Sequence, residues 1–385
     1  MIDKSRIVIF NPFDSPHANP RSIRIQNLIK EIQSEYDVLF ITNPVKGLTS
    51  RSSFIKYHGF TIQTQKGNSI KNNIFTSILK KIIWPDVLLL NSIFHGMVYI
   101  FKYYKSNDIV ITVSNPVSVH CIGILLKIFR KRIFWIADIG DQFQSANQSI
   151  FGFFSNLFES YVIRKASKIV TNSNGILSHL KILYPRCENK FLVIHNGSSI
   201  DFSDIEFDNS EPYIISYMGN SYEPIRSGIE ELKVLSEVQL LLLKNKLHLD
   251  IQLIGRQNSS LVDKFQSSNI HFIPHCNSDE LLQHYSKSRI LFSLANKNYA
   301  GMPSKLEEYC STGIPIIYFC YSEEDPGVSF LHQYKNHLIF IIGTSSTSML
   351  FEFIDLHLKE DLRTKPPKTM KNQSYWLKLL EDLNI

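Results

Sequence analysis

Short apolar runs and helical patterns alternate along almost the whole chain. The runs are continuous, as in RIVIF (6–10) and DIVITV (108–113), which is typical of parallel strands covered on both faces. Between the runs, apolar residues recur at the spacing of one helix face, as in SIRIQNLIKEI (22–32). The pattern predicts an α/β fold built from parallel sheets with helices on both sides.

The apolar runs fall into two series. Strands are expected at 6–10, 37–41, 86–90, 108–113, 132–137, 168–172 and 191–195, and then at 213–219, 249–255, 270–274, 289–295, 315–319 and 337–342. The polar, acidic segment SSIDFSDIEFDNSEP (198–212) separates the series and is a candidate linker. The sequence therefore predicts two doubly wound, Rossmann-like domains joined near residue 200 and facing a cleft, with a further helix at 375–383.

Composition supports a globular protein in a reducing compartment. Of the 385 residues, 44% are hydrophobic and 20% are charged. The five cysteines are odd in number and scattered without a CxxC pair, which argues against a disulfide framework and against a zinc site. The charged N-terminus reads as a first strand rather than a signal peptide, and polar residues interrupt the longest apolar stretch (82–101), which makes it a poor membrane span.

Charge divides unevenly between the two series. Residues 1–200 carry 24 Lys and Arg against 11 Asp and Glu, whereas residues 201–385 carry 17 against 24. A basic half suggests contact with an anionic surface or substrate, although drift in surface charge is the plainer alternative. Membrane or phosphate is favoured over nucleic acid because the basic residues are not interleaved with stacking aromatics in a recognisable module. The run KIFRKRIF (127–134) is either a solvated helix end or a site for anionic lipid.

Several function classes lack their motifs. No GxGxxG follows a strand, and neither GxxxxGK[ST] nor GxSxG is present, which argues against a dinucleotide fingerprint, a P-loop NTPase and a nucleophile elbow. No DxD ends a strand, and no His or Cys cluster has metal-ligand spacing, so no metal centre is expected.

Glycines and cations follow the strands of the second series. Gly219 and Gly255 each end an expected strand, where a backbone without Cβ can approach a phosphate. Arg226 and Arg256 accompany them as candidate diphosphate contacts. Together these residues predict an anion site at the carboxyl edge of the second sheet.

A third loop, in YAGMPSKLEEYCSTGIPII (299–317), carries an unusual lysine. The loop residues Met302 and Pro303 lead to Ser304, which with Glu307 has the spacing of a capping box at a helix start. Lys305 then places a cation at the positive end of the helix dipole. We interpret this arrangement as a phosphate site, in which the anion offsets both charges.

Two carboxylates follow a strand of the first series. Asp138 and Asp141 either cap the segment that follows or orient and activate an acceptor hydroxyl. We take them as candidate catalytic residues.

The second half resembles the nucleotide-sugar domain of GT-B glycosyltransferases, in particular the large retaining family 4 (glycosyl transferase group 1). The segment EYCSTGIPII is similar to that family's E-A-x-A-x-G-x-P-V-[IV], and PSKLEEY resembles a common variant of it. The resemblance places the second Glu of the family's Glu-x7-Glu segment at Glu308 and implies that Glu308 binds the donor ribose while the preceding helix start receives the diphosphate. Ala300 stands where the family carries its first Glu, which lies near the sugar, so Lys305 or the backbone of the AGMPS loop is expected to take its place.

The first half carries the same resemblance less specifically. NPRSIRIQNL (19–28) and WIADIGDQF (135–143) resemble the family's first loop and its acceptor-side loop, with Gly140 where Arg is common. KIVTNSNGILSHL and VIHNGSSIDF resemble the elements that precede the interdomain linker. The expected domains are an acceptor-binding domain at 1–200, a nucleotide-sugar domain at 201–365, and a C-terminal helix at 366–385 that crosses back to the first domain.

The resemblance implies a metal-independent, retaining transfer of sugar from a UDP- or GDP-sugar to a sugar hydroxyl, with no cofactor beyond that substrate. The basic first half suggests a lipid-linked acceptor at the inner face of the plasma membrane, in bacterial surface-polysaccharide assembly. Two alternatives stay open, namely a GT-B sugar-nucleotide epimerase and a catalytically silent GT-B scaffold that binds a partner.

Overall fold

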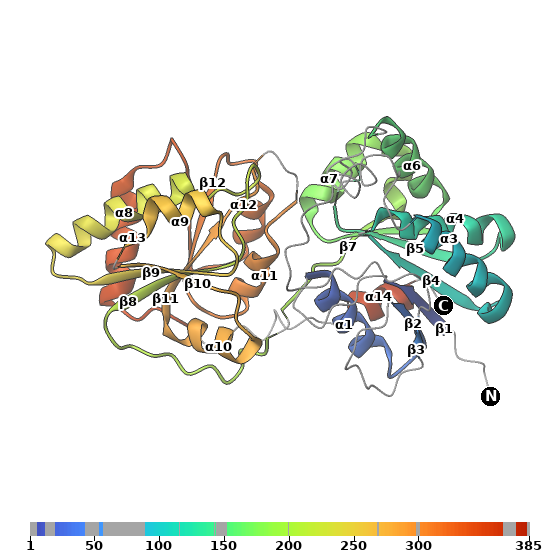
Figure 1. Cartoon of the computed structure of the whole chain (residues 1–385), viewed down its shortest axis with the longest axis horizontal. Coiled ribbons are helices and arrows are strands. Elements are labelled where there is room, and N and C mark those ends of the chain that lie inside the picture. The colour runs from blue at the N-terminus through green and yellow to red at the C-terminus, as the bar shows by residue number, and fades with distance from the viewer. Residues whose placement is uncertain are drawn as a thin grey trace. The chain divides into compact units, whose positions relative to one another are not determined.

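The computed structural model describes residues 6–11, 20–42, 54–56, 89–114, 116–141, 143, 152–198, 200–267, 269–297, 301–364 and 375–382. The chain divides into two compact units (Figure 1). Unit 1 comprises Met1–His195 together with Ser374–Ile385, and unit 2 comprises Asn196–Gln373.

Unit 1 is built on a parallel sheet in the order β3-β2-β1-β4-β5-β6-β7. Its strands are β1 (Arg6–Phe10), β2 (Asp37–Thr42), β3 (Phe54–Lys56), β4 (Asp108–Val113), β5 (Phe134–Ile139), β6 (Lys168–Thr171) and β7 (Phe191–Val193). Its helices are α1 (Pro20–Ile32), α3 (Leu89–Val98), the π-helix η1 (Tyr99–Tyr103), the 3₁₀ turns η2 (Val117–Val119) and η3 (Pro185–Lys190), α4 (His120–Phe129), α6 (Gly152–Lys165), α7 (Asn174–Leu183) and α14 (Tyr375–Asp382).

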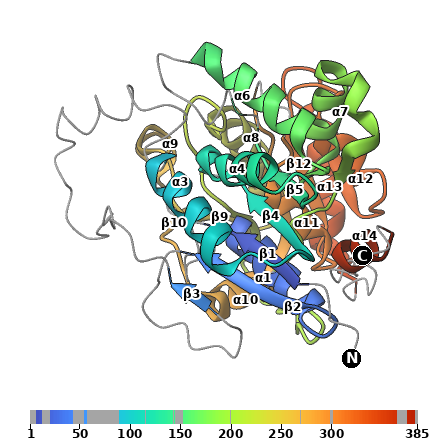
Figure 2. The same cartoon turned by 90° about the vertical axis from the view of Figure 1, so that its right-hand side faces the viewer.

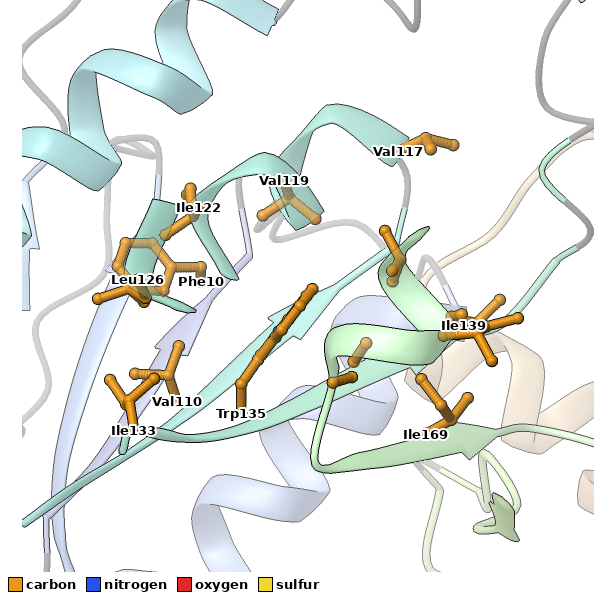
Figure 3. Close-up of a cluster of buried hydrophobic side chains, with 14 of the residues drawn as sticks. Phe10, Val110, Val117, Val119, Ile122, Leu126, Ile133, Trp135, Ile139 and Ile169 are labelled. Carbon is orange, nitrogen blue, oxygen red and sulfur yellow. The ribbon is translucent and has the colours of Figure 1, made fainter. Parts of the chain in front are cut away.

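The strands of this sheet bury both faces. Alternate residues of β1 point to opposite sides, so Val8 packs in a core with α4, α6 and α7, whereas Ile7 packs in a core with α1 and α14. In the first core, the Trp135 indole lies against α4 (Figure 3), and its Nε1–H donates to Thr112 Oγ1 at 2.8 Å. A Cβ added at Gly123 of α4 would lie 1.9 Å from Trp135 Cε2, so this position accommodates only glycine.

The last helix belongs to unit 1, which confirms the predicted return of the C-terminus. Trp376, Leu379 and Leu380 of α14 are buried in the α1 core, and the backbone N–H of Trp376 donates to the Glu31 carboxylate at 3.2 Å. In Figure 1, α14 accordingly lies beside α1.

Unit 2 repeats the architecture with a six-stranded parallel sheet in the order β10-β9-β8-β11-β12-β13. Its strands are β8 (Tyr213–Met218), β9 (Leu249–Ile254), β10 (Ile270–Ile273), β11 (Ser288–Leu294), β12 (Ile316–Cys320) and β13 (His337–Ile341). Its helices are α8 (Ile229–Lys244), α9 (Ser259–Phe265), α10 (Ser278–Lys287), α11 (Ser304–Cys310), α12 (Pro326–Leu331) and α13 (Thr347–Lys359). Helices α8 and α13 share one core with the sheet, and α10, α11 and α12 share the other.

These two doubly wound sheets confirm the predicted fold class, and three local predictions are corrected. The run at 86–90 was expected to be a strand, but Leu89 and Leu90 begin α3, because a short apolar run suits a buried helix as well as a strand. The three-residue strand β3 was not expected. The candidate linker contributes Phe202 to the core of unit 2, where its ring contacts Tyr285, so this part of the segment is packed within unit 2.

Within the ranges described above, no helix is both long enough and apolar enough to cross a membrane.

Candidate functional site

The strand order of unit 2 locates its ligand edge. Strands β8 and β11 are neighbours from which the chain winds outward in opposite directions. In open α/β sheets, ligands bind beyond the carboxyl ends of the strands at such a switch point. Gly219 and Arg226 follow β8, and Asn296 follows β11, so these residues lie at that edge.

Two of the predicted glycines lie where a side chain would not fit. A Cβ at Gly219 would lie 2.7 Å from the Tyr217 hydroxyl oxygen. Gly255 has a φ of +124°, and a Cβ there would lie 2.6 Å from the Gly219 carbonyl oxygen. The backbone at the end of β9 therefore touches that at the end of β8, and a side chain at Gly255 would separate them, whereas one at Gly219 would displace the Tyr217 ring.

Hydrogen bonds to neutral groups hold Arg226 at this edge. It closes a turn with Tyr222 through two backbone hydrogen bonds of 2.7 and 2.8 Å. Its Nη1 lies 3.3 Å from the Tyr217 hydroxyl, and its Nη2 donates to Asn296 Oδ1. Its Nε is buried without a hydrogen-bond partner, and the guanidinium forms no ion pair with a described residue. A partly buried cation in this state favours an anionic ligand.

Asn296 links Arg226 to the third predicted loop. Its Nδ2 donates to the Gly301 carbonyl at 2.6 Å, while its Oδ1 accepts from Arg226. The next residue, Lys297, donates its backbone N–H to Ile225 at 2.7 Å. The loops after β8 and β11 are thus tied together, and Met302–Ser304 follow directly.

Arg256 is more exposed than Arg226. Its backbone is fixed, because its N–H donates to Asn220 Oδ1 at 2.8 Å and its carbonyl accepts from Ser221 at 3.0 Å. Its side chain is exposed and has no hydrogen bond or ion pair with any residue in the described ranges. Arg256 is therefore available to a ligand from solvent.

The predicted capping box at α11 is wrong. The helix does begin at Ser304, but its N-cap is Pro303, and no side chain caps it. The Glu307 carboxylate instead accepts the backbone N–H of Gly197 at 2.9 Å. This contact joins residues far apart in the chain, so local spacing could not reveal it.

Lys305 and Glu308 form an ion pair. Lys305 Nζ lies 2.5 Å from Glu308 Oε1, and the Tyr285 hydroxyl donates to the same oxygen at 2.5 Å. The Glu308 side chain is buried and that of Lys305 is partly exposed. The carboxylate therefore supplies the negative partner for Lys305 that we had expected from a phosphate. Ala300, at the predicted departure from the family pattern, lies outside the described residues.

A second carboxylate is buried near the same edge. Glu231, in the first turn of α8, accepts the Tyr321 hydroxyl at Oε1 over 2.9 Å, and its Oε2 is buried without a hydrogen-bond partner. Burial raises the pKa of Glu231, with the neighbouring Glu230 adding to the shift.

In unit 1, Asp138 is paired rather than open. It is buried at the end of β5, and both of its oxygens accept from Arg24 of α1, at 2.8 and 3.3 Å. Arg24 also donates to the carbonyls of Ile194 and His195, which follow β7. This arrangement fixes three segments of unit 1, and a catalytic role for Asp138 stays a prediction.

Asp141 follows β5, and His120 is the first residue of α4. Asp141 is partly buried, and its catalytic role also stays a prediction. His120 is fully buried, with Nδ1 2.8 Å from Thr112 Oγ1 and Nε2 2.9 Å from Ser114 Oγ, and its ring stacks on Phe143. Both ring nitrogens are therefore hydrogen-bonded, as expected of a structural histidine.

Three further residues of unit 2 contribute to this site. Asn296 directly follows an expected strand, so the rule that selected Gly219 also applied to it. Tyr285 and Glu231 lie in helices, where no pattern marks them. Among the described residues, no group of three or more His, Cys, Asp or Glu is placed to hold a metal ion.

Solved structures share this architecture along the whole chain. TarM aligns over 100% of this chain and 98% of its own, with a TM-score of 0.63 and 12% identity. The lipopolysaccharide outer core galactosyltransferase WaaB aligns over 98% and 99%, with a TM-score of 0.58 and 13% identity. A putative UDP-N-acetylglucosamine 2-epimerase from Listeria monocytogenes aligns over 99% and 97%, with a TM-score of 0.56 and 12% identity.

No protein-family model matches the chain, and no curated protein sequence matches it. At 11–13% identity, structural similarity defines the fold. The chain has the two-domain GT-B fold, which its glycosyltransferase neighbours share.

Proposed function

We propose that the protein is a metal-independent GT-B glycosyltransferase that transfers a sugar from a UDP- or GDP-sugar to a sugar hydroxyl with retention of configuration. The observation that carries the proposal is Arg226, a cation without a carboxylate partner among the described residues, at the switch point of unit 2. A diphosphate supplies the charge and the acceptor oxygens that this guanidinium lacks.

Arg226 has the attributes of a leaving-group contact. In glycosyl transfer from a nucleoside diphosphate, negative charge accumulates on the diphosphate as the sugar departs. A fixed guanidinium lowers the energy of that transition state without reorganising, because Tyr217 and Asn296 already hold it. Glu308, whose charge Lys305 offsets, is our proposed ribose contact, as the family resemblance implies.

The neighbours support the donor class. TarM of S. aureus has been solved in complex with UDP, and so has an α-glucosyltransferase of the same fold. By extension, we propose a lipid-linked acceptor in bacterial capsule or lipopolysaccharide assembly, with the enzyme in the cytoplasm at the inner face of the plasma membrane. This setting is supported by WaaB, a lipopolysaccharide outer core galactosyltransferase, and by WaaG, a glycosyltransferase involved in lipopolysaccharide biosynthesis.

A second candidate is a sugar-nucleotide epimerase, which the likeness to the Listeria protein favours. One experiment separates the candidates. A panel of UDP- and GDP-sugars is screened for thermal stabilisation, and each sugar that stabilises the protein is then incubated with it and its products analysed. We expect stabilisation and slow release of nucleoside diphosphate. Formation of an epimeric sugar nucleotide favours the second candidate, and no stabilisation by any donor favours a silent scaffold.

A further inference from the structure

Helix α3 and the π-helix that continues it carry an exposed apolar stripe. Leu90, Phe94 and Phe101 are 78%, 55% and 70% exposed, and they are spaced four and seven residues apart. This spacing places them on one side of the helix. Large apolar side chains that line up along an exposed helix mark an interaction surface, whereas scattered ones do not.

The stripe continues onto the end of α4. Helices α3 and α4 lie side by side (Figure 2), and a Cβ at Gly96 of α3 would touch Leu125 of α4 at 3.3 Å. Further along, the Phe101 ring lies 6.2 Å from the ring of Phe129. Ile128 and Phe129 are themselves exposed. The two helix ends therefore form one apolar surface.

Cations border this surface. Lys102, Arg130, Lys131 and Arg132 are all exposed, and none forms an ion pair within the described part of the chain. Lys127 is excluded from this group, because its Nζ turns inward to the Ile133 carbonyl at 2.7 Å. The sequence places no Asp or Glu between positions 86 and 108, or between 108 and 138, so no carboxylate from these segments offsets the charge.

We propose that this surface docks unit 1 onto an anionic lipid bilayer. The apolar–basic surface comprises Leu90, Phe94, Phe101, Ile128, Phe129, Lys102, Arg130, Lys131 and Arg132. Apolar side chains enter the boundary between headgroups and acyl chains, and the cations bind the anionic headgroups. The inference deepens the proposed function, on which it rests for the lipid-linked acceptor, and names the surface that brings the protein to that acceptor.

A second copy of this chain is the less suitable occupant. A symmetric dimer through this surface would set four cations of one copy against the same four of the other. Like charges brought together in a contact that excludes water are unfavourable. An anionic bilayer is complementary to both the apolar and the basic part.

The test measures binding of the full chain to vesicles by co-sedimentation without nucleotide. Vesicles of phosphatidylcholine alone are compared with vesicles that also contain phosphatidylglycerol. We expect binding only to the anionic vesicles, with a partition coefficient that falls as salt rises. The Lys131→Ala/Arg132→Ala variant should bind the anionic vesicles roughly 25-fold more weakly, because each basic residue at an anionic surface raises the affinity about fivefold. The Phe101→Ser/Phe129→Ser variant should bind these vesicles at least about tenfold more weakly.

The matched control is Leu240→Ser/Leu243→Ser, which removes two exposed leucines from α8 and should leave binding unchanged. The proposal is overturned if wild-type protein does not bind anionic vesicles, or if both surface variants bind as wild type does. It is also overturned if the wild type is a dimer that the Phe variant dissociates. Nucleotide affinity, measured on the same variants, should equal that of the wild type. Failure of the proposed donor site therefore shows as loss of nucleotide binding with vesicle binding intact.

Discussion

The side chain of Lys305 is neutralised by that of Glu308, one helical turn further along α11, with 2.5 Å between Nζ and Oε1. Lys305 is therefore a weaker candidate for a phosphate contact than its position in the first turn of the helix suggested. Arg226, by contrast, has only neutral hydrogen-bond partners among the described residues, so its charge is available to a diphosphate.

Two substitutions of Glu308 should distinguish its effect on nucleotide binding from its effect on stability. Glu308→Gln keeps an acceptor for the Tyr285 hydroxyl but loses the charge, so we expect normal unfolding and roughly tenfold weaker binding of UDP or GDP. Glu308→Ala leaves both Tyr285 and Lys305 without their acceptor and should also destabilise unit 2, by about 1–3 kcal/mol. Calorimetric titration and thermal scans measure the two effects.

Lys305→Met is the companion variant. Because Glu308 offsets the lysine charge, Lys305→Met should weaken nucleotide binding less than Arg226→Ala does. An equal or larger loss would show that Lys305 leaves Glu308 and contacts the phosphate itself.

Asp138 should behave as half of a buried ion pair. Asp138→Leu leaves the Arg24 charge buried and unpaired, which costs roughly 3–5 kcal/mol. The double variant Arg24→Met/Asp138→Leu should recover much of that loss, because no charge stays buried. All three tryptophans lie in unit 1, so Trp fluorescence in urea reports this unit's unfolding. A single variant that is fully stable yet inactive would instead favour the catalytic role.

Glu231 should make stability depend on pH. Burial raises its pKa above the ordinary value near 4.5, so the folded state holds this proton to higher pH than the unfolded state does. The free energy of unfolding therefore decreases as pH rises above about 4.5, through the raised pKa of the folded state. Glu231→Gln keeps an acceptor for Tyr321 and removes this effect, so its stability relative to wild type should increase between pH 5 and 8.

Glu237→Gln, an exposed position on the same helix, serves as the control for thermal scans across that pH range. If the difference in unfolding free energy between Glu231→Gln and wild type is the same at every pH, Glu231 has the same pKa in the folded and unfolded states, which contradicts the prediction.

Gly123→Ala should destabilise unit 1 by about 1–3 kcal/mol, since its methyl group must displace the buried Trp135 indole. Gly96→Ala on the adjacent helix is the control. There the nearest atom is a leucine methyl at 3.3 Å, and the gain in helix propensity, about 1 kcal/mol, offsets a mild contact. Urea unfolding followed by Trp fluorescence compares them, and equal stability of the two variants would contradict the packing described for Trp135.

The strands and the doubly wound order were predictable because continuous apolar runs and helical periods are local signals. Leu89 and Leu90 show the limit of such signals, since the same run suits a strand or a buried helix. Arg226 was predictable as a strand-end cation, but its lack of a counter-ion among the described residues was not, because that depends on where each carboxylate lies in the fold.

The contacts that define the site are tertiary. Glu307 and Gly197 are 110 residues apart, and Glu308 and Tyr285 are 23 apart. A capping-box spacing competes with such partners, and at α11 the distant backbone N–H prevailed. Asp138 likewise matched the rule for a strand-end carboxylate, and its pairing with Arg24 shows only in the folded chain.

Arg226 is proposed to bind the diphosphate of a nucleotide donor. Calorimetric titration tests this directly. Three proteins are compared, namely wild type, Arg226→Ala and the exposed control Lys244→Ala. Each is titrated with UDP, GDP, uridine and guanosine. We expect wild type and the control to bind one of the diphosphates far more tightly than its nucleoside. Arg226→Ala should lose at least about tenfold of that preference, while retaining the folded state. Equal affinity of Arg226→Ala and wild type for the diphosphate, or no binding of either diphosphate by wild type, would contradict the account.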